Sequence, residues 1–139
     1  MFTALLVFGT RPEVVKLAPV HRELRARPER FRLVCCSTGQ HRELLDQMLH
    51  VFDIQPDLDL DIIKHNQGLF HLTSSVLSKM EDVLNTVQPD VTIVQGDTSS
   101  AFAAALGSFY CRIPVVHVEA GLRSYDKFQP FPEEMNRVF

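Results

Sequence analysis

Residues 3–13 read TALLVFGTRPE and place an apolar run directly before a turn and a helix start. An apolar run of this length is typical of a strand that is buried on both faces, as in a parallel sheet. Pro12 suits the first turn of a helix, because its missing N–H would have no partner there. Apolar spacing extends this helix through Leu24, and Pro28 ends it. The stretch therefore predicts a strand, a turn and a helix.

The rest of the chain repeats this alternation of strands and helices. Further strands are predicted over residues 31–36, 57–62, 91–94 and 115–118. Further helices are predicted over residues 44–52, 67–87 and 101–110 and from Pro130–Glu133 onward. The second of these strands alternates in polarity like an edge strand, and the last one is buried in character. Because right-handed crossovers cover both faces of a parallel sheet, the pattern predicts one Rossmann-like α/β domain over residues 1–139.

The composition supports one compact, soluble domain. The 139 residues are 45% hydrophobic and 22% charged, which is enough apolar material for a core. The 14 Lys and Arg residues against 17 Asp and Glu give a net charge of -3, with no basic excess for binding nucleic acid. No apolar run approaches the roughly 18 residues that a membrane span needs. We expect neither nucleic acid nor a membrane as a partner.

The cysteines and the first residues indicate where the protein works. Cys35, Cys36 and Cys111 fit neither a disulfide framework nor the spacing of metal ligands. We expect all three to be buried thiols. The first eight residues lack the charged region and the cleavage site of a signal peptide. These features predict a cytoplasmic protein.

Three of the predicted strands end in polar segments, which read GTRPE at 9–13, QGDTSS at 95–100 and EAGLRS at 119–124. In an open parallel sheet, ligands bind beyond the carboxyl ends of the strands, near the point where the strand order reverses. We therefore expect these segments to meet at one edge of the sheet and to form the functional site.

Three residues of these segments, together with Lys16 about one helical turn beyond the first segment, are candidates from the pattern alone. Asp97 is a possible catalytic carboxylate, and capping of the next helix is its alternative role. Glu119 follows an apolar strand directly, and a dry neighbourhood would raise its pKa and suit it to proton transfer. Arg11 and Lys16 could face an anion, or they could be ordinary surface charges. No dinucleotide fingerprint, Walker A sequence, nucleophile elbow or metal-binding histidine pair is present, so we expect neither a cofactor nor a metal.

Five motifs occur in register, and they read FGTRPE at 8–13, QHRE at 40–43, GDT at 96–98, HVEAGLR at 117–123 and PFPEEMNR at 130–137. Together they closely resemble the N-terminal domain of the non-hydrolysing bacterial UDP-N-acetylglucosamine 2-epimerases. The resemblance covers the whole chain and implies the N-terminal half of a two-domain fold like that of glycosyltransferase-B enzymes. In this family a second domain binds most of the UDP and supplies a catalytic histidine. We therefore expect residues 1–139 alone to be inactive.

The resemblance also implies a reaction and a set of site residues. The reaction would interconvert UDP-N-acetylglucosamine and UDP-N-acetylmannosamine for cell-surface polysaccharide precursors, through elimination of UDP to 2-acetamidoglucal and its re-addition. The family's catalytic carboxylates fall on Asp97, Glu119 and Glu133, and its substrate-binding cations fall on Arg11 and Lys16. We expect at least one of the three carboxylates to be the base that acts on carbon 2.

Regulation and the alternative functions follow from the same resemblance. Gln40 and His41 match positions that contact a second, allosteric UDP-N-acetylglucosamine in regulated members, with helix capping as the alternative role. Some members carry an arginine where this chain has Asn66. The complete enzyme is expected to be a homodimer.

Two alternative functions remain. The first is an enzyme that releases free N-acetylmannosamine or acts on a modified UDP-sugar. The second is a non-catalytic sugar-nucleotide-binding or oligomerisation module.

Overall fold

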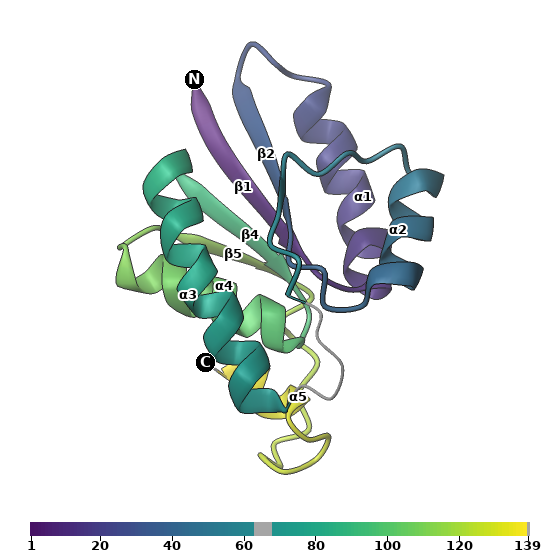
Figure 1. Cartoon of the computed structure of the whole chain (residues 1–139), viewed down its shortest axis with the longest axis vertical. Coiled ribbons are helices and arrows are strands. Elements are labelled where there is room, and N and C mark those ends of the chain that lie inside the picture. The colour runs from purple at the N-terminus through teal and green to yellow at the C-terminus, as the bar shows by residue number, and fades with distance from the viewer. Residues whose placement is uncertain (63–67, 139) are drawn as a thin grey trace.

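The computed structural model describes residues 1–62 and 68–138 and shows a five-stranded sheet between two pairs of helices (Figure 1). The strands are β1 (Phe2–Phe8), β2 (Phe31–Ser37), β3 (Leu58–Asp59), β4 (Val91–Gln95) and β5 (Val115–Val118). All pairs are parallel, and the strand order is β3-β2-β1-β4-β5. The predicted Rossmann-like α/β architecture is confirmed.

The helices cover both faces of the sheet. They are α1 (Arg11–Arg25), α2 (Arg42–Val51), α3 (Leu69–Val87), α4 (Ser99–Tyr110) and the short α5 (Glu133–Val138). Alternate side chains of β1 pack on opposite sides: Leu6 faces the core beneath α1 and α2, whereas Leu5 faces the core beneath α3 and α4. Both side chains are fully buried, as expected for a central parallel strand. No helix in the described ranges is long and apolar enough to cross a membrane.

The strand order reverses between β1 and β4, and the polar turns after these two strands lie at this point. The turn after β1 packs tightly against its neighbours at Gly9. A Cβ atom at Gly9 would lie 2.0 Å from Oγ1 of Thr38 and 2.8 Å from Oγ of Ser100. Only glycine fits there, and its absent side chain lets the starts of α1, α2 and α4 converge.

Glu13 fixes the start of α1 from inside the protein, where its side chain is only 1% exposed. Its Oε2 accepts hydrogen bonds from the backbone N–H groups of Gly9 (2.8 Å) and Thr10 (2.7 Å) and from Oγ1 of Thr10 (2.8 Å). The backbone bond to Thr10 is one half of a capping box. Burial raises the pKa of the Glu13 carboxyl above its usual value of 4.5, although these hydrogen bonds act in the opposite direction.

Both edge strands differ from the expectation. The strand predicted over residues 57–62 is reduced to two residues, because the backbone of Asp61 adopts a left-handed conformation (φ 44°) and Arg42 binds the carboxylates of Asp59 and Asp61. The strand Val115–Val118, which was expected to be buried, is only partly covered, since β5 is the other edge of the sheet. The edge position of β5 also leaves Glu119, the residue that follows this strand, partly exposed to solvent.

The raised pKa of Glu13 predicts a pH dependence of stability. A group whose pKa is higher in the folded chain stabilises the fold fully below its unfolded pKa and loses that contribution as the pH rises through its folded pKa. Glutamine has the same shape and does not titrate. We therefore expect the free energy of unfolding of the wild type, relative to Glu13→Gln, to fall as the pH rises above about 4.5.

Urea denaturation of both proteins between about pH 4 and pH 8 measures this difference. Subtraction of the variant removes the titration of the other acidic groups. A difference that stays constant or increases with pH would contradict the raised pKa.

The cysteines predict a simple pattern of thiol reactivity. Cys35 and Cys36 are fully buried in β2, and burial raises the pKa of each thiol to about 12. Cys111, which was expected to be buried, is exposed at the end of α4, so that expectation was wrong for this residue. Because the thiolate is the reactive species, we expect Ellman's reagent to modify Cys111 alone in the folded chain and all three cysteines in urea. Rapid modification of a second thiol under native conditions would contradict this assignment.

Candidate active site at the carboxyl edge of the sheet

Asp97 lies in the turn after β4, and its side chain is free of helix capping. Gly96, in the left-handed region (φ 72°), makes the turn possible, and its N–H donates to the carbonyl of Val118 at 3.0 Å. Thr98 caps α4, because its Oγ1 accepts a hydrogen bond from the N–H of Ala101 at 2.9 Å. Thr98, and not Asp97, therefore caps the helix. The Asp97 side chain remains 28% exposed.

Arg137 on α5 links the ends of β4 and β5. One guanidinium nitrogen lies 2.9 Å from Oδ2 of Asp97 and donates to the carbonyl of Leu122 at 2.8 Å. Another lies 3.8 Å from Oε1 of Glu119. The Arg137 side chain is only 10% exposed, which strengthens its interaction with both carboxylates. Arg137 lies within the last of the five sequence motifs, from which no role for it was predicted.

Glu119 follows β5 directly and sits between two cations. Its backbone is in the left-handed region (φ 60°), an unusual conformation for a residue other than glycine. Its Oε2 lies 3.1 Å from Nζ of Lys16 on α1, and its Oε1 faces Arg137. The expected dry neighbourhood is not found, because β5 is an edge strand and the Glu119 side chain is 29% exposed. The surroundings of the Glu119 carboxylate are therefore set by its two cationic partners and not by desolvation.

Glu133 begins α5 and faces a cavity of about 360 Å³ that it shares with Asp97. One of its oxygens, Oε2, is buried without a hydrogen-bond partner among the described residues. Asn136 holds α5 against the turn after β4 by donating from Nδ2 to the Asp97 carbonyl at 2.8 Å. Glu133 and Asp97, 36 positions apart in the sequence, thus face the same space.

Glu134, the residue after Glu133 on α5, anchors the loop that precedes this helix. Its buried carboxylate accepts hydrogen bonds from Nε of Arg123 (2.8 Å) and from the backbone N–H groups of Ser124 (3.0 Å) and Tyr125 (3.1 Å). The hydrogen bond from Ser124 contributes most to holding the pKa of Glu134 below its usual value, and the bonds from Arg123 and Tyr125 add to it. The loop is therefore fastened to α5, which carries Glu133 and Arg137.

Gln40 and His41 line the same cavity from the end of β2. Oγ of Ser100 donates to Oε1 of Gln40 at 2.7 Å, which links this segment to α4. His41 occupies the N-cap position of α2, but its side chain makes no capping hydrogen bond. The capping alternative therefore fails for His41. Asn66, which was considered with this pair, lies outside the described residues.

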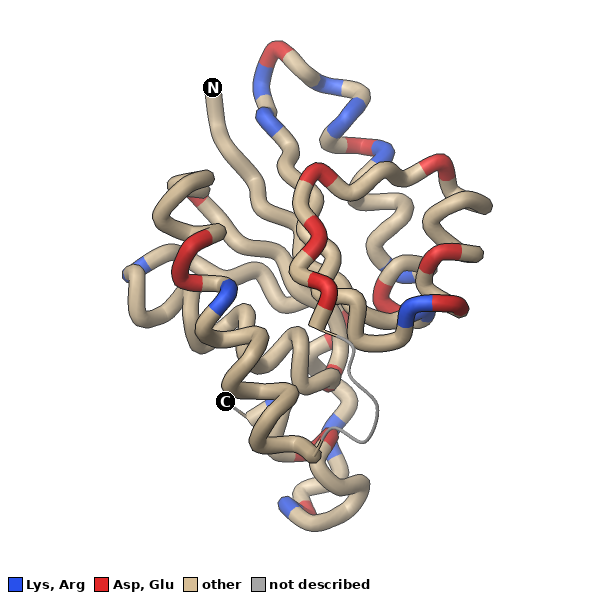
Figure 2. Tube along the Cα trace, viewed as in Figure 1, with Lys and Arg blue, Asp and Glu red and all other residues tan. Residues whose placement is uncertain are grey.

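The two predicted cations have different surroundings. Arg11 is exposed at the first position of α1 and forms no ion pair within residues 1–62 and 68–138, whereas Lys16 pairs with Glu119. Other arginines gather around the turn between α1 and β2, at the opposite end of the sheet (Figure 2). Because a helix N-terminus also favours negative charge, Arg11 is well placed to meet an anion.

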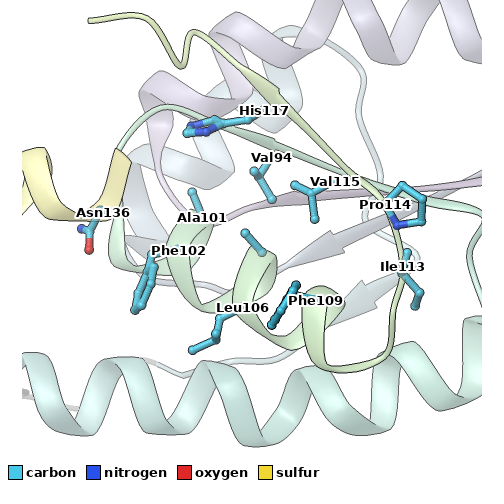
Figure 3. A pocket seen from close by; sticks show the side chains of 11 residues that line it. Val94, Ala101, Phe102, Leu106, Phe109, Ile113, Pro114, Val115, His117 and Asn136 are labelled. Atoms are coloured by element: carbon cyan, nitrogen blue, oxygen red, sulfur yellow. The ribbon is translucent and has the colours of Figure 1, made fainter. Parts of the chain in front are cut away.

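A larger, apolar cavity of about 690 Å³ lies between α4 and β5 (Figure 3). Apolar side chains such as Phe102, Leu106 and Phe109 form most of its wall, and no carboxylate of the described residues lines it. His117 reaches back to the site by forming a 2.6 Å hydrogen bond between Nε2 and the Gly96 carbonyl. Across the described ranges, no three His, Cys, Asp or Glu side chains are grouped so that they could hold a metal ion. The acid, base and cation chemistry is therefore concentrated at the carboxyl edge.

The structure thus brings together most of the predicted site. Asp97 and Glu119 share Arg137, while Asp97, Glu133, Gln40 and His41 share one cavity. Carboxylates in different surroundings, with cations between them, can give and take protons around a ligand that carries negative charge. Glu13 and Arg137 had no predicted role. The spacing of Thr10 and Glu13 is a capping-box signature that could have indicated the capping role of Glu13. Its bond to Thr98 and the ion pairs of Arg137 could be recognised only in three dimensions, because those partners are remote in the sequence.

Comparison with known proteins identifies the family of the chain. The sequence profile of the UDP-N-acetylglucosamine 2-epimerase family matches residues 22–139. The UDP-N-acetylglucosamine 2-epimerases of Neisseria meningitidis and Yersinia pestis are 51% and 52% identical to the chain over 133 residues. These matches cover 96% of this chain but only 36% and 35% of the two relatives, so the chain spans about a third of their length.

Solved structures show the same relationship. The Neisseria meningitidis enzyme bound to UDP-GlcNAc matches with a TM-score of 0.94 at 49% identity, over 99% of this chain and 37% of that chain. The Methanocaldococcus jannaschii enzyme in complex with UDP-GlcNAc and UDP matches with a TM-score of 0.86 at 35% identity, over 99% and 37% of the two chains. The family profile, the sequence relatives and these solved structures together show that the chain belongs to the UDP-N-acetylglucosamine 2-epimerase family.

Proposed function

We propose that this chain supplies the N-terminal half of an enzyme that interconverts UDP-N-acetylglucosamine and UDP-N-acetylmannosamine. The observation that carries the proposal is the pairing of Asp97 and Glu119, at the ends of neighbouring strands, with the largely buried side chain of Arg137. The relatives bound to UDP-GlcNAc support a UDP-sugar as the substrate. The chain's share of its relatives' length, about a third, means that the rest of the site would come from other residues.

The chemistry of this conversion explains why carboxylates and cations would be needed together. Carbon 2 of a UDP-linked sugar has no adjacent carbonyl, so its proton is not acidic enough for simple enolisation. Elimination of UDP gives 2-acetamidoglucal, and UDP then adds back while a proton arrives at the opposite face of carbon 2. The route requires a base, an acid on the other side of the ring and cations for the departing diphosphate.

The site residues have surroundings that suit these tasks. Asp97, Glu119 and Glu133 would carry the proton transfers, and at least one of them would remove the proton from carbon 2. Arg11, exposed at the start of α1 and free of ion pairs within the described ranges, would stabilise the diphosphate. Lys16 would also bind the negatively charged substrate, next to Glu119, with which it forms a 3.1 Å ion pair.

The proposal extends to regulation and assembly. Gln40 and His41 line the cavity that contains Asp97 and Glu133, which supports their assignment to a second, activating UDP-N-acetylglucosamine next to the catalytic carboxylates. The complete enzyme would be a cytoplasmic homodimer that supplies precursors of cell-surface polysaccharides. These features rest on the resemblance to the family and belong to the same proposal.

A chimera tests whether this half contributes to catalysis. We expect the 139-residue chain alone to show no turnover of UDP-N-acetylglucosamine. A chimera in which it replaces the matching part of the Neisseria meningitidis enzyme is expected to form UDP-N-acetylmannosamine, as measured by proton NMR of the sugar nucleotides. The unmodified Neisseria enzyme and its C-terminal part alone are the controls.

Release of free N-acetylmannosamine by the chimera would favour a hydrolysing relative instead. A folded chimera that binds UDP but forms no epimer would indicate a non-catalytic binding module. Turnover by the isolated chain would contradict the division of the site between two halves.

Glu119→Gln in the chimera tests the carboxylate assignment. Glutamine keeps the shape of the side chain but cannot transfer a proton at this position. Because general acid–base catalysis is typically worth about 10² to 10⁴ in rate, we expect kcat to fall by roughly that factor while UDP binding is nearly unchanged. Steady-state kinetics and calorimetric titration with UDP measure the two effects.

The matched control is Glu29→Gln, since Glu29 is exposed in the loop between α1 and β2. This control is expected to keep wild-type activity. Wild-type turnover by Glu119→Gln, or a loss of activity that accompanies unfolding in thermal denaturation, would contradict a catalytic role for Glu119.

A further inference from the structure

We infer that Glu13 is a positioning residue that fixes the turn carrying Asp97 relative to the turn after β1. Its consequence for catalysis rests on the proposed function, whereas its structural part can be tested on this chain alone. This role of Glu13 goes beyond helix capping, because the two oxygens of its carboxylate bind two different segments.

The hydrogen bonds of Glu13 are divided between these segments. Oε2 accepts from Gly9 and from both the N–H and the hydroxyl of Thr10, in the turn after β1. Oε1 accepts from Oγ1 of Thr98 at 2.8 Å, in the turn after β4 and 85 positions away in the sequence. Capping of α1 needs only the first oxygen. The second oxygen makes a connection that the helix does not require.

This connection crosses the place where the sheet opens. The ladder between β1 and β4 pairs Ala4 with Val91 and continues only to the pair of Leu6 and Ile93. Beyond this last pair, β1 and β4 lead into helices on opposite faces of the sheet, as expected at a point where the strand order reverses. The Glu13 side chain therefore joins the two turns beyond the last backbone pairing between their strands.

Thr98 transmits the position of Glu13 to Asp97. Its Oγ1 donates to Glu13 and accepts from the N–H of Ala101, so this one atom contacts both Glu13 and α4. Asp97 is the adjacent residue, and its carboxylate lies 2.9 Å from Arg137. A change in the position of Thr98 would therefore alter the geometry between Asp97 and Arg137.

The burial of Glu13 makes this link rigid. A carboxylate that is 1% exposed is tolerated only when its oxygens are hydrogen-bonded, and four donors surround this one. Glutamine can preserve most of this arrangement, because its oxygen can accept from Gly9 and Thr10 while its amide donates to Oγ1 of Thr98. Alanine removes every contact. Comparison of Glu13→Gln with Glu13→Ala therefore shows whether an effect depends on the hydrogen bonds of residue 13.

Amide NMR spectra of the 139-residue chain test the structural part. We expect Glu13→Ala to shift the amide signals of Asp97 and Thr98 as well as those of Gly9 and Thr10, and Glu13→Gln to restore most of them. Val14→Ala is the matched control, because it shortens the fully buried side chain next to Glu13 on the same helix and leaves the carboxylate of Glu13 and its hydrogen bonds in place. Shifts at Asp97 that are equal in Val14→Ala and Glu13→Ala would overturn the inference.

Thr98→Val provides a second route if Glu13→Ala does not fold. It removes the contact with Glu13 from the other end and is expected to shift the amide signals of Gly9 and Thr10. Unchanged signals at these two residues in Thr98→Val would also overturn the inference.

Kinetics of the same variants in the chimera test the catalytic part. Because small misplacements of reacting groups can cost about 10²-fold in rate, we expect Glu13→Ala to lower kcat by about 10- to 100-fold with a smaller change in KM. Glu13→Gln is expected to recover most of the lost kcat, and Val14→Ala to keep the wild-type value. Equal kcat values for Glu13→Ala and Val14→Ala would refute positioning, whereas an inactive wild-type chimera would refute the proposed function and leave the NMR result to decide on Glu13.

Discussion

The reversal of strand order between β1 and β4 is the constraint on which the rest of the structure depends. Parallel pairing brings the carboxyl ends of the strands to one edge, and the reversal directs the following helices to opposite faces. The turns after β1 and β4 therefore face each other across an opening. Gly9 allows the close packing beneath this opening, and Glu13 connects its two sides. The position of Asp97 depends on both features.

Charge pairing then determines the form of the site. Arg137 is nearly buried between Asp97 and Glu119, and Lys16 faces Glu119 from the other side. These cations offset the repulsion between carboxylates that the fold brings to one edge. Glu133 faces the shared cavity with one buried oxygen that has no partner among the described residues. The carboxylates therefore have distinct surroundings, which is the condition for distinct roles in proton transfer.

Much of the fold could be predicted from the sequence, because the apolar runs and helical spacings of the central elements reflect burial on both sides. The edge strands were predicted less well, since the extent of β3 depends on how Arg42 binds Asp59 and Asp61, and the exposure of β5 depends on what lies beside it. Asp97 could be selected as a site residue because it lies in the polar turn that follows a buried strand. The role of Arg137 could not, because a motif shows its presence but not the partners that it reaches across the fold.

The central claim is that the carboxylates at this edge move a proton at carbon 2 of a UDP-sugar. Incubation of the chimera with UDP-N-acetylglucosamine in D₂O tests it most directly, with proton NMR to follow the hydrogen at carbon 2. Our account predicts that the epimer carries deuterium at carbon 2, and that joint replacement of Asp97 by Asn and of Glu119 and Glu133 by Gln abolishes this exchange in a folded protein. An epimer that keeps its original hydrogen, or undiminished exchange in the triple variant, would contradict the account.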